Sequence, residues 1–191
     1  GLDCFACYWV AVDFHENAYF YRELHESNLL VSQAAQKMID WTGDEAVYAT
    51  YAPPDMLNRH RETGKSTADI FYDYGVKLSI ASNDRAAGWL NVKEALKVVS
   101  DEQGFPTSRV KFFPNCRQLI KSLGEIQTDE KDPNDVANTP HDLTHSVDAV
   151  RYFFAANARA AKIAPEEKKY NFKSEKPKVS PIGKGIRLKV V

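Results

Sequence analysis

The segment from Pro140 to Phe154 constrains the fold most, because it predicts a helix with two different faces. Thr139 is expected to be the N-cap and Pro140 the first helical residue, and the helix is predicted to run to about Lys162. Apolar residues recur in it at three- and four-residue spacing, which indicates a stripe packed on a core. The stripe consists of Leu143, Val147, Val150, Phe154, Ala158 and Ala161.

Another side of this helix carries titratable residues. At about 100° per residue, His145 and Asp148 lie together away from the apolar stripe, with Asp142 nearby. Imidazole and carboxylate groups in this arrangement can bind a metal ion, but they more often form a solvated helix face. Asp142 also suits the positive end of the helix dipole, so it can act in capping alone. The metal hypothesis therefore depends on the rest of the chain.

Composition bounds the class of protein. The chain has 191 residues and 43% hydrophobic content, which is enough to bury a core of its own. No apolar run reaches the ~20 residues that a membrane span requires, so no membrane partner is expected. Three cysteines are too few for a disulfide framework or a four-ligand zinc site, which favours a reducing cytoplasmic setting.

Charge is distributed unevenly along the chain. Residues 165–191 carry eight Lys or Arg and three Glu, a net charge of +5, so residues 1–164 carry −6 of the total of −1. We therefore predict one domain over 1–164 and a basic C-terminal tail over 165–191, of the kind that contacts nucleic acid or a partner protein. An acidic body is unusual for a simple DNA-binding module. It is easier to explain if some of its carboxylates bind cations.

The order of predicted elements indicates an α/β fold. Gly1-Leu2-Asp3 is interpreted as the end of a first strand, and a hairpin of two aromatic strands follows it. Strands that alternate with helices come next, which predicts a mixed sheet, antiparallel over its first three strands and then parallel, flanked by helices. The loops 50–55 and 82–85 then lie at the carboxyl ends of parallel strands, where ligand-binding loops are usually found in such sheets. After the strand end at 1–3, the predicted strands are 5–12, 19–25, 47–51, 77–81 and 110–113. Of the helices predicted before the last one, the first begins at 29 or 32 and ends at 41, and the others span 67–74, 91–99 with Asn91 as its N-cap, and 115–123.

Five segments, in this order, resemble the C-terminal nuclease domain of the large terminase subunits of tailed bacteriophages, which has a ribonuclease H-like fold. The last segment is the most specific, and the five together are more specific than any one of them. They are Gly1-Leu2-Asp3, Tyr51-Ala52-Pro53-Pro54-Asp55-Met56, Thr63-Gly64-Lys65-Ser66, Ser82-Asn83-Asp84-Arg85 with Gly88-Trp89, and His145-Ser146-Val147-Asp148-Ala149-Val150-Arg151-Tyr152.

The resemblance implies three acidic positions that bind two divalent cations, Mg²⁺ or Mn²⁺. Asp3 matches the first-strand carboxylate and Asp148 the last-helix carboxylate, with His145 as an additional ligand. The predicted strand 47–51 contains no acid, so Asp55 is the nearest candidate for the middle position and Asp84 is the second. The family also has a turn after its first-strand aspartate, whereas here Asp3 is followed directly by Cys4.

The chemistry of phosphodiester hydrolysis suits these residue types. Two divalent ions about 4 Å apart can activate a water and stabilise the leaving oxyanion. Mg²⁺ prefers carboxylate oxygen, whereas an imidazole ligand fits Mn²⁺ better. Lys65 and Arg85, with Arg59 and Arg61, are candidates for phosphate contact, and Asp84 lies in the same candidate DNA-contacting loop as Arg85.

The resemblance also implies a biological setting. It predicts an endonuclease that cleaves concatemeric viral DNA during genome packaging, in the host cell cytoplasm at the portal vertex of the procapsid. Its expected partners are double-stranded DNA, an N-terminal ATPase domain of the same protein, the portal protein and the small terminase subunit. Two alternatives stay open: a non-catalytic docking module that binds portal or DNA, and another ribonuclease H-like nuclease such as a junction resolvase.

Overall fold

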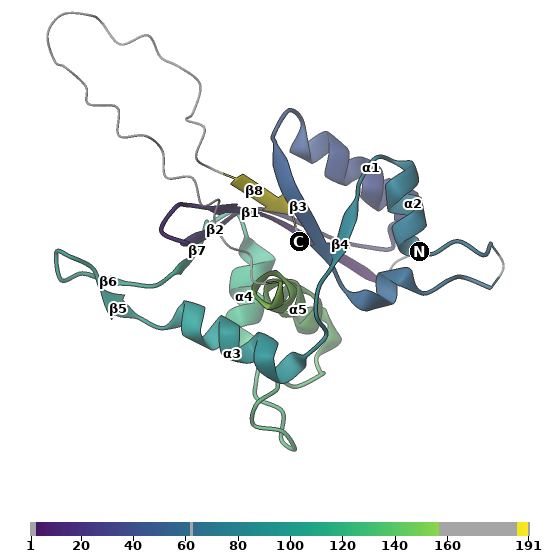
Figure 1. The fold of residues 1–191 in the computed structure, drawn as a ribbon. Coiled ribbons are helices and arrows are strands. Elements are labelled where there is room, and N and C mark those ends of the chain that lie inside the picture. The colour runs from purple at the N-terminus through teal and green to yellow at the C-terminus, as the bar shows by residue number, and fades with distance from the viewer. Residues whose placement is uncertain (1–2, 62, 157–186, 191) are drawn as a thin grey trace, which may run out of the picture.

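The computed structural model describes residues 3–61, 63–156 and 187–190. No helix within these ranges is long and apolar enough to cross a membrane. An initial hairpin is followed by helices and strands that alternate (Figure 1). In chain order the elements are β1 (Cys4–Val12), β2 (Ala18–Ser27), α1 (Val31–Thr42), β3 (Val47–Ala52), the 3₁₀ turn η1 (Pro54–Leu57), α2 (Thr67–Asp73), β4 (Leu78–Ile80), α3 (Arg85–Leu96), β5 (Val99–Ser100), β6 (Pro106–Thr107), β7 (Val110–Phe112), α4 (Arg117–Glu125), α5 (His141–Ala155) and β8 (Arg187–Val190).

The sheet is mixed, which confirms the predicted α/β class. Among the described residues, six strands lie in the order β4-β3-β8-β1-β2-β7, and β5 and β6 form a separate pair. The β1–β2 hairpin is antiparallel, whereas β3 pairs with β4, and β2 with β7, in parallel. Strand β8 lies between β1 and β3, antiparallel to the first and parallel to the second. The antiparallel hairpin followed by parallel strands is therefore observed, whereas residues 1–2 of the strand predicted before the hairpin lie outside the described residues.

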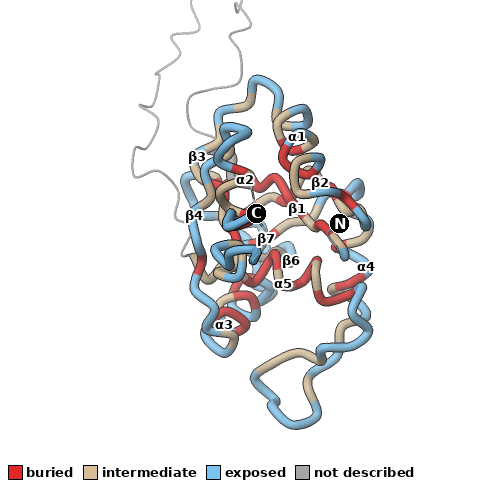
Figure 2. The backbone as a smooth tube through the Cα atoms, turned by 90° about the vertical axis from the view of Figure 1, so that its right-hand side faces the viewer, coloured by how far each residue is buried: buried red, intermediate tan, exposed pale blue. Residues whose placement is uncertain are grey.

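Helices cover both faces of the sheet. Successive side chains of a strand point to opposite faces, so β1 contributes to two cores. Tyr8 and Val10 pack with α3, α4 and α5, whereas Cys7 and Trp9 pack with α1 and α2. Figures 1 and 2 show these two layers, with buried positions gathered in β1, β2 and α5. The α3–α4–α5 layer is the one that positions the candidate site.

Helix α3 begins earlier than predicted. Its N-cap is Asp84, whose carboxylate accepts a hydrogen bond from the backbone N–H of Ala87 at 3.0 Å. The prediction that Asn91 caps a helix over 91–99 is therefore wrong, because Asn91 lies inside α3. The sequence 82–85 was expected to be a loop, but the Asp84 side chain satisfies a free N–H of the first turn and allows the helix to start there.

Helix α5 is confirmed at its centre and differs at its start. Its N-cap is Pro140, with no side-chain hydrogen bond, so the predicted capping by Thr139 is wrong. The described part of the helix ends at Ala155, and the predicted continuation to Lys162 lies outside the described residues. The predicted basic tail also lies outside them, except for residues 187–190, which form β8.

Candidate metal centre

Helix α5 presents three titratable side chains along one side. His141 and His145 are four residues apart, and Asp148 follows three residues later, so they lie above one another on successive turns. The other side of the helix is fixed by Val147 and Val150, which are fully buried in the core. The packing of α5 therefore determines where these ligand atoms point.

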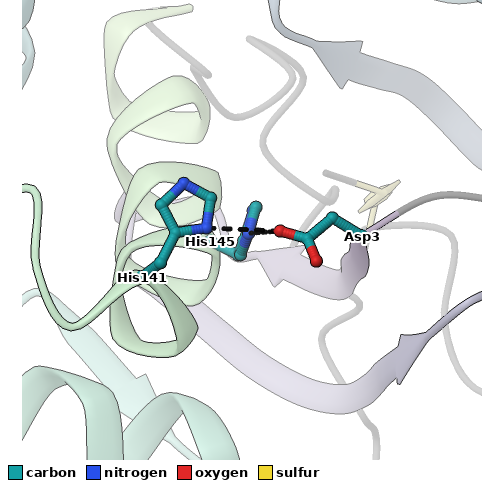
Figure 3. A group of neighbouring side chains, drawn as sticks. All are labelled: Asp3, His141 and His145. Carbon is teal, nitrogen blue, oxygen red and sulfur yellow. Dashed lines mark ion pairs between the residues drawn. The ribbon is translucent and has the colours of Figure 1, made fainter.

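Asp3, immediately before β1, faces both histidines (Figure 3). Its Oδ2 atom lies 3.3 Å from Nδ1 of His141 and 3.8 Å from Nε2 of His145. The two imidazole rings meet edge to face with their centroids 4.7 Å apart. One ligand atom from each of the three residues lies within 4.8 Å of the others. The start of β1 and the first two turns of α5 thus bring a carboxylate and two imidazoles together.

The imidazole of His145 is the most enclosed of these groups. The pKa of His145 lies below its usual value, mainly because the ring is partly buried and also because His141 is close. Asp3 and Asp148 act in the opposite direction. The Nε2 atom of His145 is buried and has no hydrogen-bond partner among the described residues. A neutral imidazole with an unsatisfied ring nitrogen is a suitable metal ligand.

Asp148 is held by two arginines. Nε of Arg151 donates a hydrogen bond to its Oδ1 atom at 2.8 Å, and Nη1 of Arg85 lies 3.3 Å from the same oxygen. Arg151 is fully buried, with its guanidinium carbon 4.2 Å from the centroid of the Tyr152 ring. Because a buried side chain cannot move freely, Arg151 fixes the position of the Asp148 carboxylate.

Asp135, in the acidic loop before α5, positions Arg85. Its carboxylate accepts hydrogen bonds from Nε and Nη2 of Arg85, at 2.6 and 2.8 Å, and from the indole N–H of Trp89 at 2.9 Å. The hydrogen bonds from Arg85 are the main reason that the pKa of Asp135 lies below its usual range. This bidentate pair directs the remaining N–H group of Arg85 toward Asp148.

One open cleft of about 610 Å³ is lined by Asp3, Arg85, His145 and Asp148, whereas His141, Asp135 and Arg151 are not among its lining residues. Asp55 joins it because the Pro53-Pro54 step ends β3 and the η1 turn places the carboxylate beyond the strand end. The titratable residues with predicted site roles that line the cleft are Asp3, Asp55, Arg85, His145 and Asp148.

Two predicted site residues lie elsewhere. Asp84 is the N-cap of α3. Its neighbours Asn83 and Arg85 line the cleft, whereas Asp84 is not among the lining residues. Lys65 is exposed and forms an ion pair with Asp73 at 2.6 Å, outside the set of described residues that line the cleft. Of the two candidates for the middle carboxylate, Asp55 is therefore the one that shares a cleft with Asp148.

Sequence reasoning missed two residues of this site. The spacing of His141 and His145 at four residues was a visible signal, because such a pair lies on one helix face and is a known zinc-binding pattern. Asp135 gave no signal, since it is one of several acidic residues in a loop and its role depends on contacts with residues about 50 positions earlier.

A comparison with solved structures adds to this geometry. The structure titled "Structure of P22 Large terminase nuclease domain" matches with a TM-score of 0.54 and 16% sequence identity, covering 79% of this chain and 81% of that chain. The chain has the fold of a large-terminase nuclease domain. No protein-family profile and no curated protein matches the sequence. The terminase-nuclease fold is thus established by shape, and the roles of the cleft residues rest on the contacts described above.

Proposed function

We propose that this chain is a divalent-metal-dependent endodeoxyribonuclease that cleaves concatemeric viral DNA during genome packaging. One observation carries the proposal: Asp3, Asp55, His145 and Asp148, from separate parts of a terminase-nuclease fold, line a single open cleft. Carboxylate oxygens with one imidazole suit Mg²⁺ or Mn²⁺. The buried Nε2 of His145, which accepts or donates no hydrogen bond within the described ranges, also suits a metal ligand.

The side chains of the cleft have distinct tasks in this proposal. Two bound cations would supply an activated water and stabilisation of the leaving oxyanion. Asp3, Asp55, His145 and Asp148 would hold them, and Arg151 keeps the Asp148 carboxylate in place. Arg85 places a cation on the cleft wall, where it can neutralise a backbone phosphate.

The proposed substrate, partners and location are those expected for a nuclease domain with the terminase fold. The substrate is double-stranded DNA, and the chain acts beside an N-terminal ATPase domain, the portal protein and the small terminase subunit, at the portal vertex in the host cytoplasm. Lys65, with its exposed side chain, is a candidate for DNA contact away from the cleft, whereas Arg85 contacts DNA at the cleft itself. The basic tail over 165–191 is proposed to bind DNA or the portal.

Cleavage of supercoiled plasmid tests the proposal. The purified chain is incubated with Mg²⁺, Mn²⁺ or EDTA, together with the variants Asp55→Asn and Asp84→Asn. Asn preserves the size of both side chains, and it also serves well as an N-cap, so Asp84→Asn should leave α3 intact. Metal-dependent nicking that is lost in Asp55→Asn and kept in Asp84→Asn would support the site as described.

Other outcomes would redirect the assignment. Absence of cleavage by the folded wild-type chain with either metal would favour the alternative of a docking module for portal or DNA. Cleavage of a four-way junction but not of linear or supercoiled duplex would favour a junction resolvase. Cleavage that is lost in Asp84→Asn and kept in Asp55→Asn would place the middle ligand at Asp84.

A further inference from the structure

We propose that the cleft binds an unpaired DNA nucleotide, whose base stacks on Tyr152 while its phosphate faces Arg85. This inference rests on the proposed function, because it specifies the form of DNA that the nuclease cleft accepts. It concerns the apolar wall of the cleft, to which cation-assisted hydrolysis of a phosphodiester gives no task. The wall consists of Phe5, Tyr51, Pro53, Pro54, Met56 and Tyr152.

The volume and lining of the cleft suit a nucleotide better than the outside of a duplex. At about 610 Å³, the cleft is as large as pockets that enclose small ligands, which are mostly apolar with a few polar groups. In a paired duplex the base faces are stacked on one another, so a cleft beside it meets phosphates, sugars and groove edges. The apolar wall is explained if a base leaves the stack and enters the cleft, because aromatic side chains bind the faces of unpaired bases.

Tyr152 forms a fixed aromatic platform in this wall. Its hydroxyl donates a hydrogen bond to Oδ1 of Asn83 at 3.1 Å, and the guanidinium carbon of Arg151 lies 4.2 Å from the centroid of its ring. Arg151 is fully buried and is not a cleft-lining residue, so it supports the ring from the protein side. A ring that is already held in place loses little conformational entropy when a base stacks on it.

The polar groups of the cleft set the orientation of the nucleotide. Arg85 lines the same cleft as Tyr152, and Asp135 anchors its guanidinium, so a fixed cation is available for a phosphate. Tyr152 follows Asp148 by four residues on α5, so its ring lies one turn from a candidate cation ligand. A base stacked on Tyr152 therefore places its own phosphate near Arg85 and Asp148.

A smaller recess of about 50 Å³ adjoins the apolar wall. It shares Phe5, Tyr51 and Met56 with the cleft, and most of its other lining residues are apolar. Removal of apolar area from water is favourable, so a planar base gains free energy against this side of the cleft, whereas a phosphate does not. The wall and the recess thus favour the base, and Arg85 favours the phosphate.

DNA binding in EDTA tests the inference separately from cleavage. Fluorescence anisotropy compares duplexes of equal length that are fully paired, carry a central bubble of unpaired bases, or carry abasic sites in place of those bases. Equal numbers of phosphates make the salt-dependent part of binding the same. The abasic bubble keeps the flexibility of the bubble and removes only the bases, so the difference between the two bubbles measures contacts with bases.

Matched variants assign these contacts to one side chain. Tyr152→Leu removes the aromatic ring, whereas Tyr152→Phe keeps the ring and removes the hydroxyl. Tyr72→Leu is the control, because Tyr72 is an exposed tyrosine of α2 that is not among the cleft-lining residues. Circular dichroism and thermal unfolding verify that each variant is folded.

The wild type, Tyr152→Phe and Tyr72→Leu should bind the bubble at least about fivefold more tightly than the abasic bubble, in line with the stacking of a base on an aromatic side chain. Tyr152→Leu should bind both bubbles equally. Equal binding of both bubbles by the wild type would overturn the inference even if Tyr152→Leu does not fold, and so would a full preference in folded Tyr152→Leu.

Plasmid cleavage separates this inference from the proposed function. Metal-dependent nicking by a wild type that binds both bubbles equally would retain the nuclease and overturn the nucleotide site. A preference for the bubble that depends on Tyr152, without nicking in either metal, would support the nucleotide site and overturn the nuclease assignment alone.

Discussion

Gly88 lies inside α3 against the buried Arg151, so Gly88→Ala tests how tightly the site is supported. A Cβ atom at this position would lie 2.7 Å from Cγ and 3.2 Å from Cδ of Arg151. Arg151 is fully buried and donates to Asp148 from Nε, so it cannot swing away without breaking that bond. The substitution should therefore disturb both packing and the Asp148 carboxylate.

Two effects of known size compete in this variant. Alanine is favoured over glycine in a helix interior by about 1 kcal/mol, whereas overpacking a filled core costs about 1–3 kcal/mol. Gly124, in α4, is the matched control, because a Cβ atom there meets nothing within 4 Å in the described structure. Gly124→Ala should gain up to about 1 kcal/mol, and Gly88→Ala should be about 1–3 kcal/mol less stable than Gly124→Ala.

Urea unfolding followed by circular dichroism measures the free energy of unfolding of both variants and the wild type. Thermal unfolding should place the melting temperature of Gly88→Ala roughly 2–12 °C below that of Gly124→Ala, at about 2–4 °C per kcal/mol for a domain of this size. Equal stability of the two variants would refute the close packing of α3 on Arg151. The same result would remove the argument that Arg151 is fixed.

Two further predictions concern single side chains. Asp135→Asn should lower the free energy of unfolding at neutral pH and make that free energy fall less steeply in acid. Arg85 lowers the pKa of Asp135, so the stabilisation by the Asp135 carboxylate is present above about pH 4 and is lost as the pH falls through the lowered pKa. Urea unfolding between about pH 3 and pH 7 measures this difference. An equally steep acid loss in the variant would contradict this. Lys65→Ala should weaken DNA binding uniformly across sequences and reduce the salt slope of log K by about 0.9, as fluorescence anisotropy at several salt concentrations would show, and an unchanged slope would exclude a phosphate contact.

Local patterns predicted the parts of the fold that depend on neighbouring residues. The two aromatic strands of the first hairpin were predicted from their composition, and Leu143, Val147 and Val150 of the predicted α5 stripe are buried as expected. The start of α3 was not predicted because glycine is a weak helix former, whereas Gly88 lies inside the helix and packs closely against Arg151. The strand β8 was missed because its sequence lies in a basic, proline-containing region.

The candidate site was predictable where one element carried several ligands. His145 and Asp148 share a helix face, so their proximity followed from helical spacing. The sequence ranked Asp55 before Asp84 only by nearness to the strand, because both follow strands; in the structure Asp55 lines the cleft, whereas Asp84 caps α3. The ion pair between Asp135 and Arg85 joins residues 50 positions apart, so no local sequence pattern predicts it.

Metal-dependent cleavage by wild type and Asp148→Asn is the most direct test of the nuclease assignment. Supercoiled plasmid is incubated with each protein in Mn²⁺, with and without EDTA, and DNA binding is measured in parallel to verify that the variant still engages its substrate. The wild type should nick and linearise the plasmid, and EDTA should abolish this cleavage. Cleavage by Asp148→Asn should be at least about a hundredfold slower, on the order of the loss when a major electrostatic group is removed from an active site. Cleavage by Asp148→Asn at the wild-type rate, or cleavage that persists in EDTA, would contradict the nuclease assignment.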